Sequence, residues 1–149
     1  MIRHHHYRSL FIMAGLSLVS MFVLMYAMVN TFVNVYANVN QLYMAGLMTA
    51  PMILIELAIM RSMYKDKRKN LIVASAAVVA GVLFWTGIRQ QAAVTDTQFL
   101  RSMIPHHASA ILMCEQAPLR SDEARRLCQE IISSQQREIA QMKALLKAN

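Results

Sequence analysis

The stretch from Leu10 to Thr31 reads LFIMAGLSLVSMFVLMYAMVNT, and the chain carries no charged side chain from there to residue 55. A soluble domain rarely lacks surface charge over so long a run. About 20 apolar helical residues cross a hydrocarbon layer of about 30 Å. The sequence therefore predicts three transmembrane helices, at about residues 10–31, 42–60 and 71–88. Four asparagines and a glutamine within residues 30–41 separate the first two helices, because such residues favour turns.

The placement of basic side chains predicts how these helices are oriented. Residues 1–70 hold seven basic and two acidic side chains, and residues 71–149 hold eight and six, which together give the net charge of +7. The densest cluster, RSMYKDKRK at residues 61–69, lies in a short loop, and short loops rich in Lys and Arg stay cytoplasmic. We therefore expect a cytoplasmic N-terminus, with loop 32–41 and the C-terminal segment on the outer side. Charge placed in this way indicates membrane topology, and no nucleic-acid partner is expected.

The composition changes near residue 90 from apolar to mixed, which predicts a membrane domain at 1–90 and an extracytoplasmic helical hairpin at 91–149. Apolar residues recurring every three or four positions predict helices at about 96–117 and 122–147. Asp96 and Ser121 are the expected N-caps, and Pro105 should kink the first helix or start a new turn. The expected fold class is all-α.

A hairpin of about 50 residues buries little apolar surface, and domains of that size usually need a staple, a metal or a partner. We therefore expect two copies of the hairpin to pair into a four-helix bundle. The chain is thus expected to form a homo-oligomer anchored in a lipid bilayer.

The first helix of the hairpin combines residue types that bind soft metals. One stripe of this helix contains Phe99, Met103, His106, Ala110, Met113 and Ala117, with His107 and Cys114 on its flank. Imidazole and thioether suit copper, and methionine favours Cu(I) in particular. The candidate ligands are Met103, His106, His107 and Met113, together with Met142 from the second helix. That helix also offers Gln135, Gln136 and Glu138. The alternative is that the methionines fill the core and the histidines are hydrogen-bonded core residues.

The two cysteines, Cys114 and Cys128, are placed almost symmetrically about the expected turn near Ser121. In an antiparallel hairpin they would lie opposite each other, and an extracytoplasmic compartment permits a disulfide. Metal ligation by these cysteines and a pair of buried free thiols are the alternatives.

The membrane helices contain further candidates of lower weight. Methionines recur on two of them, at Met21, Met25 and Met28 and at Met44, Met48 and Met52. They could line a copper conduit, or they could be ordinary apolar residues in contact with lipid. Glu56 is the ionisable group deepest in a predicted span. Such a residue either has a function or lies at the membrane–water interface. His4, His5 and His6 lie at a free terminus, where we expect only weak metal binding.

The residues Asp96, Phe99, Met103, His106 and His107 fit a D-x-x-F-x-x-x-M-x-x-H-H pattern. The pattern continues through Ala110 and Met113 into CQEIISSQQREIAQM. This region, about residues 96–146, resembles a bacterial family called domain of unknown function 305, a ferritin-like all-helical family. Some of its members are implicated in periplasmic copper binding. The resemblance implies a bacterial inner-membrane protein with a periplasmic hairpin that is half of a ferritin-like bundle.

The chain lacks a glycine-rich phosphate loop and paired Glu-x-x-His motifs, so no enzyme activity is expected. The expected function is copper sequestration or delivery, with copper-handling proteins as partners. The rival expectations are a structural or assembly module that binds no metal, and a methionine-lined copper conduit.

Overall fold

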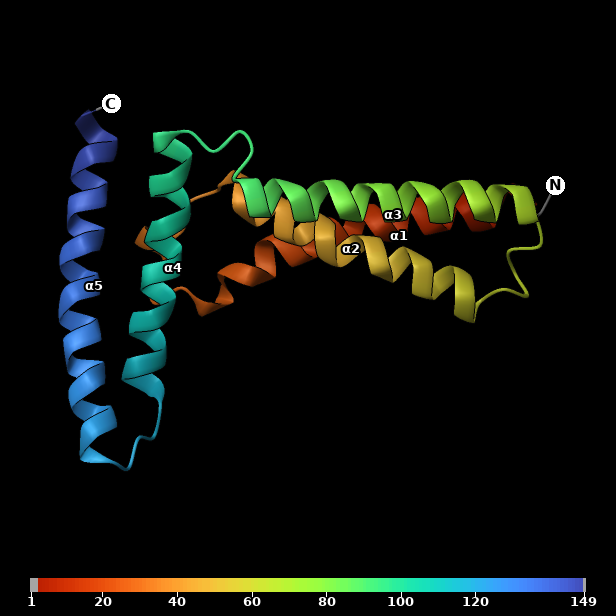
Figure 1. Cartoon of the computed structure of the whole chain (residues 1–149). Coiled ribbons are helices and arrows are strands. Elements are labelled where there is room, and N and C mark those ends of the chain that lie inside the picture. Colours follow the sequence, from red (N-terminus) through yellow and green to blue (C-terminus); the bar gives the residue numbers. More distant parts are fainter. Residues whose placement is uncertain (1–2, 149) are drawn as a thin grey trace. The chain divides into compact units, whose positions relative to one another are not determined.

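The computed structural model of the chain describes residues 3–148, with side chains described from residue 6 onward. Over these residues the chain is all-α, as predicted. Its helices are α1 (Arg3–Leu24), η1 (Met25–Met28), η2 (Phe32–Asn34), α2 (Val39–Ile59), α3 (Lys67–Gln90), α4 (Asp96–Gln116) and α5 (Asp122–Ala148) (Figure 1).

The described residues form two compact units. The three-helix unit comprises the described part of Met1–Leu24 together with Asn40–Ala93. The hairpin unit comprises Met25–Val39 together with the described part of Val94–Asn149.

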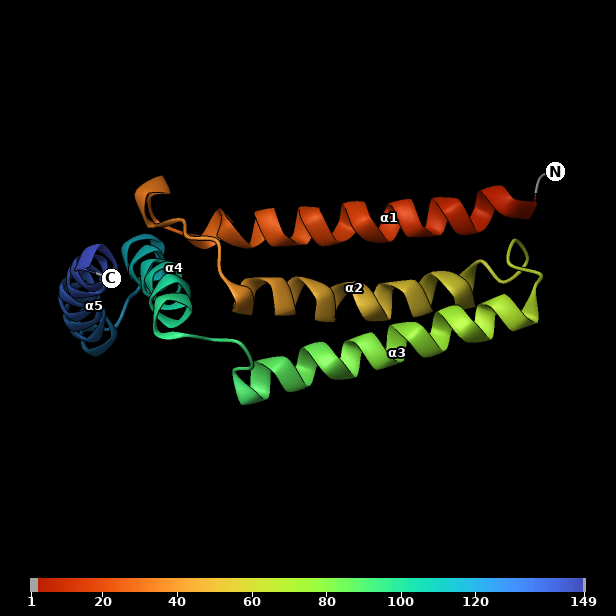
Figure 2. The same cartoon turned by 90° about the horizontal axis from the view of Figure 1, so that it is seen from above.

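The three-helix unit consists of α1, α2 and α3, which run side by side (Figure 2). All three of its helical segments are long and apolar enough to cross a membrane, as predicted from the sequence. Many large apolar side chains on them lie exposed, including Phe11, Leu16, Val19, Ile55, Ile59, Leu71, Val79, Leu83 and Trp85. So large an exposed apolar surface is typical of a protein that contacts a membrane or another protein, because exposing apolar side chains to water is unfavourable.

Small residues allow these helices to approach one another. A Cβ atom added to Gly46 of α2 would lie 2.5 Å from the nearest ring carbon of Phe84 in α3. A Cβ added to Gly81 of α3 would lie 3.3 Å from the Cβ of Ala50 in α2. Close approach at small residues is the usual way for membrane helices to pack, since the surrounding lipid is as apolar as the side chains.

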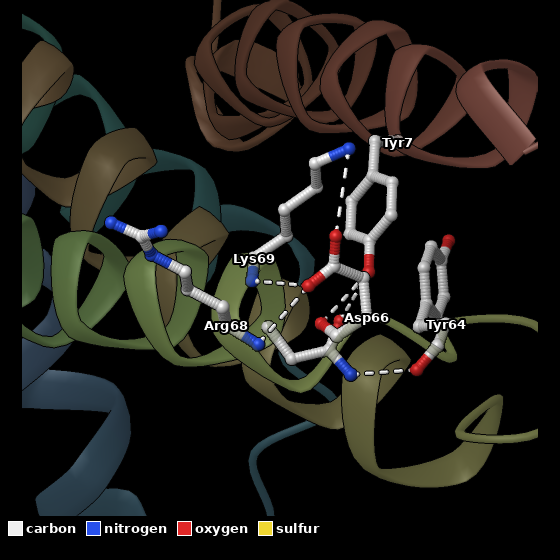
Figure 3. A network of polar contacts seen from close by, with 6 residues as sticks. Tyr7, Tyr64, Asp66, Arg68 and Lys69 are labelled. Carbon is white, nitrogen blue, oxygen red and sulfur yellow. Dashed lines mark hydrogen bonds and ion pairs between the residues drawn. The ribbon is translucent and has the colours of Figure 1, made fainter.

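A polar network ties the start of α1 to the start of α3 (Figure 3). Tyr7 donates a hydrogen bond of 2.6 Å to Oδ1 of Asn70, whose Nδ2 donates 2.7 Å to the carbonyl oxygen of Tyr64. Asp66 caps α3, because its Oδ1 accepts hydrogen bonds of 3.1 Å from the backbone N–H groups of Arg68 and Lys69. These bonds, led by the one from Lys69, hold the pKa of Asp66 below its ordinary value. The network fixes the end of the unit that carries the basic cluster.

The core of the hairpin unit lies between the antiparallel helices α4 and α5 (Figure 1). Its buried apolar side chains are Leu100, Ile104, Ala108, Ile111, Ile139 and Met142. The α4 members of this core lie one or two residues away from the predicted stripe of Phe99 to Ala117. The helix bounds follow the sequence prediction closely, since the apolar repeat ends where each helix ends.

The segment Met25–Val39 is part of the hairpin unit, and its first four residues also end the apolar helical segment His6–Met28. The α-helix α1 ends at Leu24, and two 3₁₀ turns follow. Val29 and Tyr36 from this segment pack against the hairpin core. Lys143 of α5 donates a hydrogen bond of 2.5 Å to Oδ1 of Asn34. The hairpin core is therefore completed by residues that precede it by more than 60 positions.

The ends of α4 and α5 are capped by hydroxyl side chains. Thr95, and not the predicted Asp96, is the N-cap of α4, and its Oγ1 accepts a hydrogen bond from the N–H of Gln98. Asp96 instead occupies the first turn, where its negative charge complements the helix dipole. Ser121 caps α5 as predicted, by accepting from the N–H of Ala124. Pro105 lies within α4 without ending it.

Candidate metal site in the hairpin

A disulfide sets the register between α4 and α5. Cys114 and Cys128 are bridged, and their Cα atoms lie 5.2 Å apart. His107 precedes Cys114 by seven residues, and Gln135 follows Cys128 by seven residues. Because the helices are antiparallel, equal steps from the bridge bring His107 and Gln135 to the same level of the hairpin.

The imidazole of His107 is buried and held from both sides. Its Nδ1 lies 2.9 Å from the carbonyl oxygen of Met103, one turn earlier in α4. Its Nε2 lies 2.7 Å from Oε2 of Glu138 in α5. A carbonyl oxygen only accepts hydrogen bonds, so Nδ1 carries the proton and donates it to Met103. The ring is thereby fixed with Nε2 directed at the carboxylate of Glu138.

The 2.7 Å contact between Nε2 and Oε2 has the length of a hydrogen bond, in which a proton lies between the two atoms. A metal-ligating histidine usually donates its other N–H to a backbone carbonyl or a carboxylate, as Nδ1 of His107 does. The pair therefore fits either a hydrogen-bonded core histidine or one half of a metal site. The side chain of Glu138 is 51% exposed, which gives an ion a route to the pair.

Three further side chains of the hairpin carry groups that could bind a metal. Met103 is half-buried and packs against the hairpin core, and Met142 is a buried member of that core. Oε1 of Gln135 is buried and has no hydrogen-bond partner among the described residues. A buried acceptor without a partner is costly, so its position next to the His107 level points to water or an ion there.

The other two predicted ligands lie away from this inner group. His106 is exposed, and its ring centroid lies 6.3 Å from that of His107 with the planes inclined at 61°. Met113 is 54% exposed. The structure thus brings Met103, His107 and Met142 to the inside of the hairpin and leaves His106 and Met113 on its surface. Residues 6–148 contain no group of three or more His, Cys, Asp or Glu side chains arranged to hold a metal.

Glu138 and Gln135 are the functional candidates that the sequence analysis left out of its ligand set. Both lie on the side of α5 that faces or borders α4, where apolar residues would be expected. The signal available in the sequence was a carboxylate and an amide at helix positions where apolar side chains are expected. They could not be matched to His107 until the register of the two helices was known.

Glu56 has a partner in the three-helix unit. Tyr64, in the loop after α2, donates a hydrogen bond of 3.2 Å to Oε1 of Glu56. Glu56 therefore reaches toward the end of α2 that carries the basic cluster, as expected of an interfacial carboxylate. Of the N-terminal histidines, the side chains of His4 and His5 lie outside the described residues.

Two comparisons with known proteins found a match to this chain. The family model described as "Domain of unknown function (DUF305)" matches residues 56–146. The match begins within α2, and so extends beyond the hairpin that carried the resemblance in the sequence. An uncharacterised protein of Acanthamoeba polyphaga mimivirus is 34% identical over 119 residues, which cover 78% of this chain and 76% of the viral protein. No solved structure matches the chain.

Proposed function

The chain belongs to the DUF305 family of domains of unknown function, and on this premise we propose that it is a membrane-anchored copper-binding protein. Its hairpin binds copper, most favourably Cu(I), outside the cytoplasm and sequesters or delivers the metal without catalysing a reaction. The ligands come from Met103, His106, His107, Met113 and Met142. Copper-handling proteins are its partners.

The observation that carries this proposal is the fixed imidazole of His107. Its Nδ1 is held by the Met103 carbonyl, and its Nε2 faces Glu138 at the edge of the hairpin core. This arrangement presents the nitrogen atom that a metal would use, in a hairpin whose core contains Met142 and is packed against by Met103. Thioether and imidazole together select copper over hard cations such as magnesium.

The proposed topology follows from charge and from the hairpin unit. The basic cluster between α2 and α3 favours a cytoplasmic position for that loop. With three spans, the α1–α2 segment and the C-terminal hairpin then share the outer side. The packing of Val29 and Tyr36 against the hairpin core supports this arrangement, because both segments must lie on one side to pack together. The outer side corresponds to the periplasm if the host is a bacterium.

We further propose that the hairpins of two copies pair into a ferritin-like four-helix bundle. The hairpin core holds only a few buried residues, and even with the disulfide and the Met25–Val39 segment it leaves large apolar side chains exposed. Pairing would cover them.

A structural module without metal is the second candidate, and one observation favours it. Both ring nitrogens of His107 already have protein neighbours, and Met142 is buried among apolar side chains. On this alternative, the His107–Glu138 pair is a buried hydrogen bond that holds α4 to α5.

A competition titration distinguishes the two candidates. The full chain in lipid nanodiscs is titrated with Cu(I) against a chromophoric chelator. We expect sub-micromolar binding that weakens at least about tenfold in His107→Ala, because an essential ligand is lost. Gln136→Ala, an exposed α5 residue, is the matched control and should bind as the wild type does. Binding that is absent, or unchanged in the double variant His106→Ala with His107→Ala, would favour the structural module.

A further inference from the structure

The end of the three-helix unit that carries the basic cluster contains a pocket with polar walls, here called the basic pocket. It is formed where the first turns of α1, the loop after α2 and the first turn of α3 meet. The polar and charged side chains that line it are His6, Tyr7, Ser62, Lys65, Asp66 and Lys69. The pocket encloses about 470 Å³, which lies within the range of about 300–1,000 Å³ that is usual for small-molecule sites.

Lys65 gives the basic pocket a positive charge that its neighbours do not neutralise. Among the described residues, the ammonium group of Lys65 has no ion pair and no hydrogen bond. Asp66 is the carboxylate in the lining, and its charge is already compensated (Figure 3). Its Oδ1 accepts hydrogen bonds from the backbone N–H groups of Arg68 and Lys69, and its Oδ2 lies 3.6 Å from Nζ of Lys69. The pocket therefore favours an anionic ligand.

An apolar groove runs along α1 and begins one turn after His6, and it is here called the α1 groove. The small side chains of Ser9, Ser17 and Ser20 lie in it between larger ones, which include Ile12, Leu16 and Leu24. Small residues between large ones leave a hollow, and the groove encloses about 540 Å³.

The basic pocket and the α1 groove share one face of α1. From His6, steps of three and four residues lead through Ser9, Met13, Ser17 and Ser20 to Leu24, and such steps follow a single face of a helix. The groove spans 15 residues, or about 22 Å of helix. The hydrocarbon layer is about 30 Å thick, so a groove that starts at the basic end reaches past its middle. That is the depth to which the acyl chains of one leaflet extend.

We propose that the basic pocket and the α1 groove together bind one anionic phospholipid. Its phosphate group lies at Lys65 in the pocket, and one acyl chain lies along the groove. Basic pockets between membrane helices on the cytoplasmic side are typical binding sites of lipid headgroups. A free phosphate would occupy the pocket alone, whereas the groove on the same face fits an apolar chain joined to that phosphate. The proposal requires the three helices to lie in a bilayer, and it does not depend on copper binding.

Native mass spectrometry of the full chain, released from detergent, tests the choice of lipid. The protein is offered equal amounts of phosphatidylglycerol and phosphatidylcholine with identical acyl chains. We expect one phosphatidylglycerol to be retained per chain, with a preference of at least about fivefold, because a basic side chain attracts the anionic headgroup. Equal retention of the two lipids would overturn the proposal. Displacement of phosphatidylglycerol by an excess of inorganic phosphate would show that the pocket binds a free phosphate, and would also overturn it.

A pair of lysine variants distinguishes the basic pocket from the general attraction of the basic cluster. Lys65→Gln removes a charge from the lining, and Lys67→Gln removes the same charge from an exposed position of α3 outside the lining. We expect Lys65→Gln to weaken retention of phosphatidylglycerol about fivefold, and Lys67→Gln to weaken it less than about twofold. Equal losses in the two variants would show diffuse attraction and would refute the pocket.

A second pair of variants tests the α1 groove without changing any charge. Ser17→Trp fills the groove, whereas Gly15→Trp adds the same side chain off the groove, where an added Cβ meets nothing within 4 Å. We expect Ser17→Trp to weaken retention about tenfold, since it displaces about two methylene groups of the acyl chain, and Gly15→Trp to bind as the wild type does. Wild-type retention by Ser17→Trp would refute the groove as the acyl site. Lys65→Gln, at an exposed position, decides the proposal if Ser17→Trp fails to fold.

Discussion

Removal of the disulfide should loosen the hairpin and leave the three-helix unit unaffected. The double variant Cys114→Ser with Cys128→Ser opens a loop whose ends are 14 residues apart in sequence. In the chain-entropy treatment, closing a loop of that size stabilises the folded state by about 3 kcal/mol. Because each 1.4 kcal/mol or so corresponds to a tenfold change in an equilibrium constant, the open population of the hairpin should rise about 100-fold.

Hydrogen exchange of the full chain in nanodiscs measures this change helix by helix. Amides in the middle of α4 and α5 that exchange through opening of the hairpin should exchange about 100-fold faster in the variant. Amides of α2 and α3 belong to the other compact unit and should exchange at the wild-type rate. Protection of α4 and α5 that stays within about threefold of the wild type would refute the reasoning, because the disulfide would then contribute little.

Three other changes have distinct expected results. Gly46→Ala places a Cβ 2.5 Å from the Phe84 ring and should destabilise the three-helix unit by about 1–3 kcal/mol, seen as a lower Tm in nanodiscs. Gly15→Ala, where a Cβ meets nothing within 4 Å, is the control, and an equal Tm for the two variants would contradict the packing. Asp66→Ala should lower the Tm at neutral pH, because the folded pKa of Asp66 lies below its ordinary value of 3.8 and the carboxylate stabilises the fold above that value. The difference from the wild type should shrink as the pH falls through the lowered pKa, and a difference that is independent of pH would show that charge plays no part. Glu138→Gln keeps a hydrogen-bonding group beside Nε2 of His107, so it should retain the Tm while weakening Cu(I) binding about tenfold in the chelator titration. Loss of Tm with unchanged copper binding would instead identify the pair as structural.

Local sequence was sufficient for the long helices. The charge-free runs predicted the three apolar helices, and the apolar repeats predicted α4 and α5 to within one or two residues. The first span was predicted to end at about Thr31, and the apolar helical segment ends at Met28, with the change from α-helix to 3₁₀ turn after Leu24 not visible in the apolar pattern. The segment after Leu24 packs with the hairpin, and contacts between residues so distant in sequence are not visible in a local pattern.

The candidate site, too, could be predicted only in part from the local sequence. The residue types in α4 predicted a metal-binding character, but α4 carries two overlapping apolar stripes. The one through Leu100 and Ile104 faces α5, and the one through Phe99 and His106 does not. Which stripe is buried depends on the partner helix, so the contact between His107 and Glu138 required the structure.

The packing of Met25–Val39 against the hairpin also orders events during synthesis. Val29 and Tyr36 leave the ribosome at least 60 positions ahead of α4 and α5, against which they pack. Their burial must wait until the last helix has been made. A chain that is truncated before α5 would therefore leave this early segment without the helices that bury it, as a substrate for quality-control proteases.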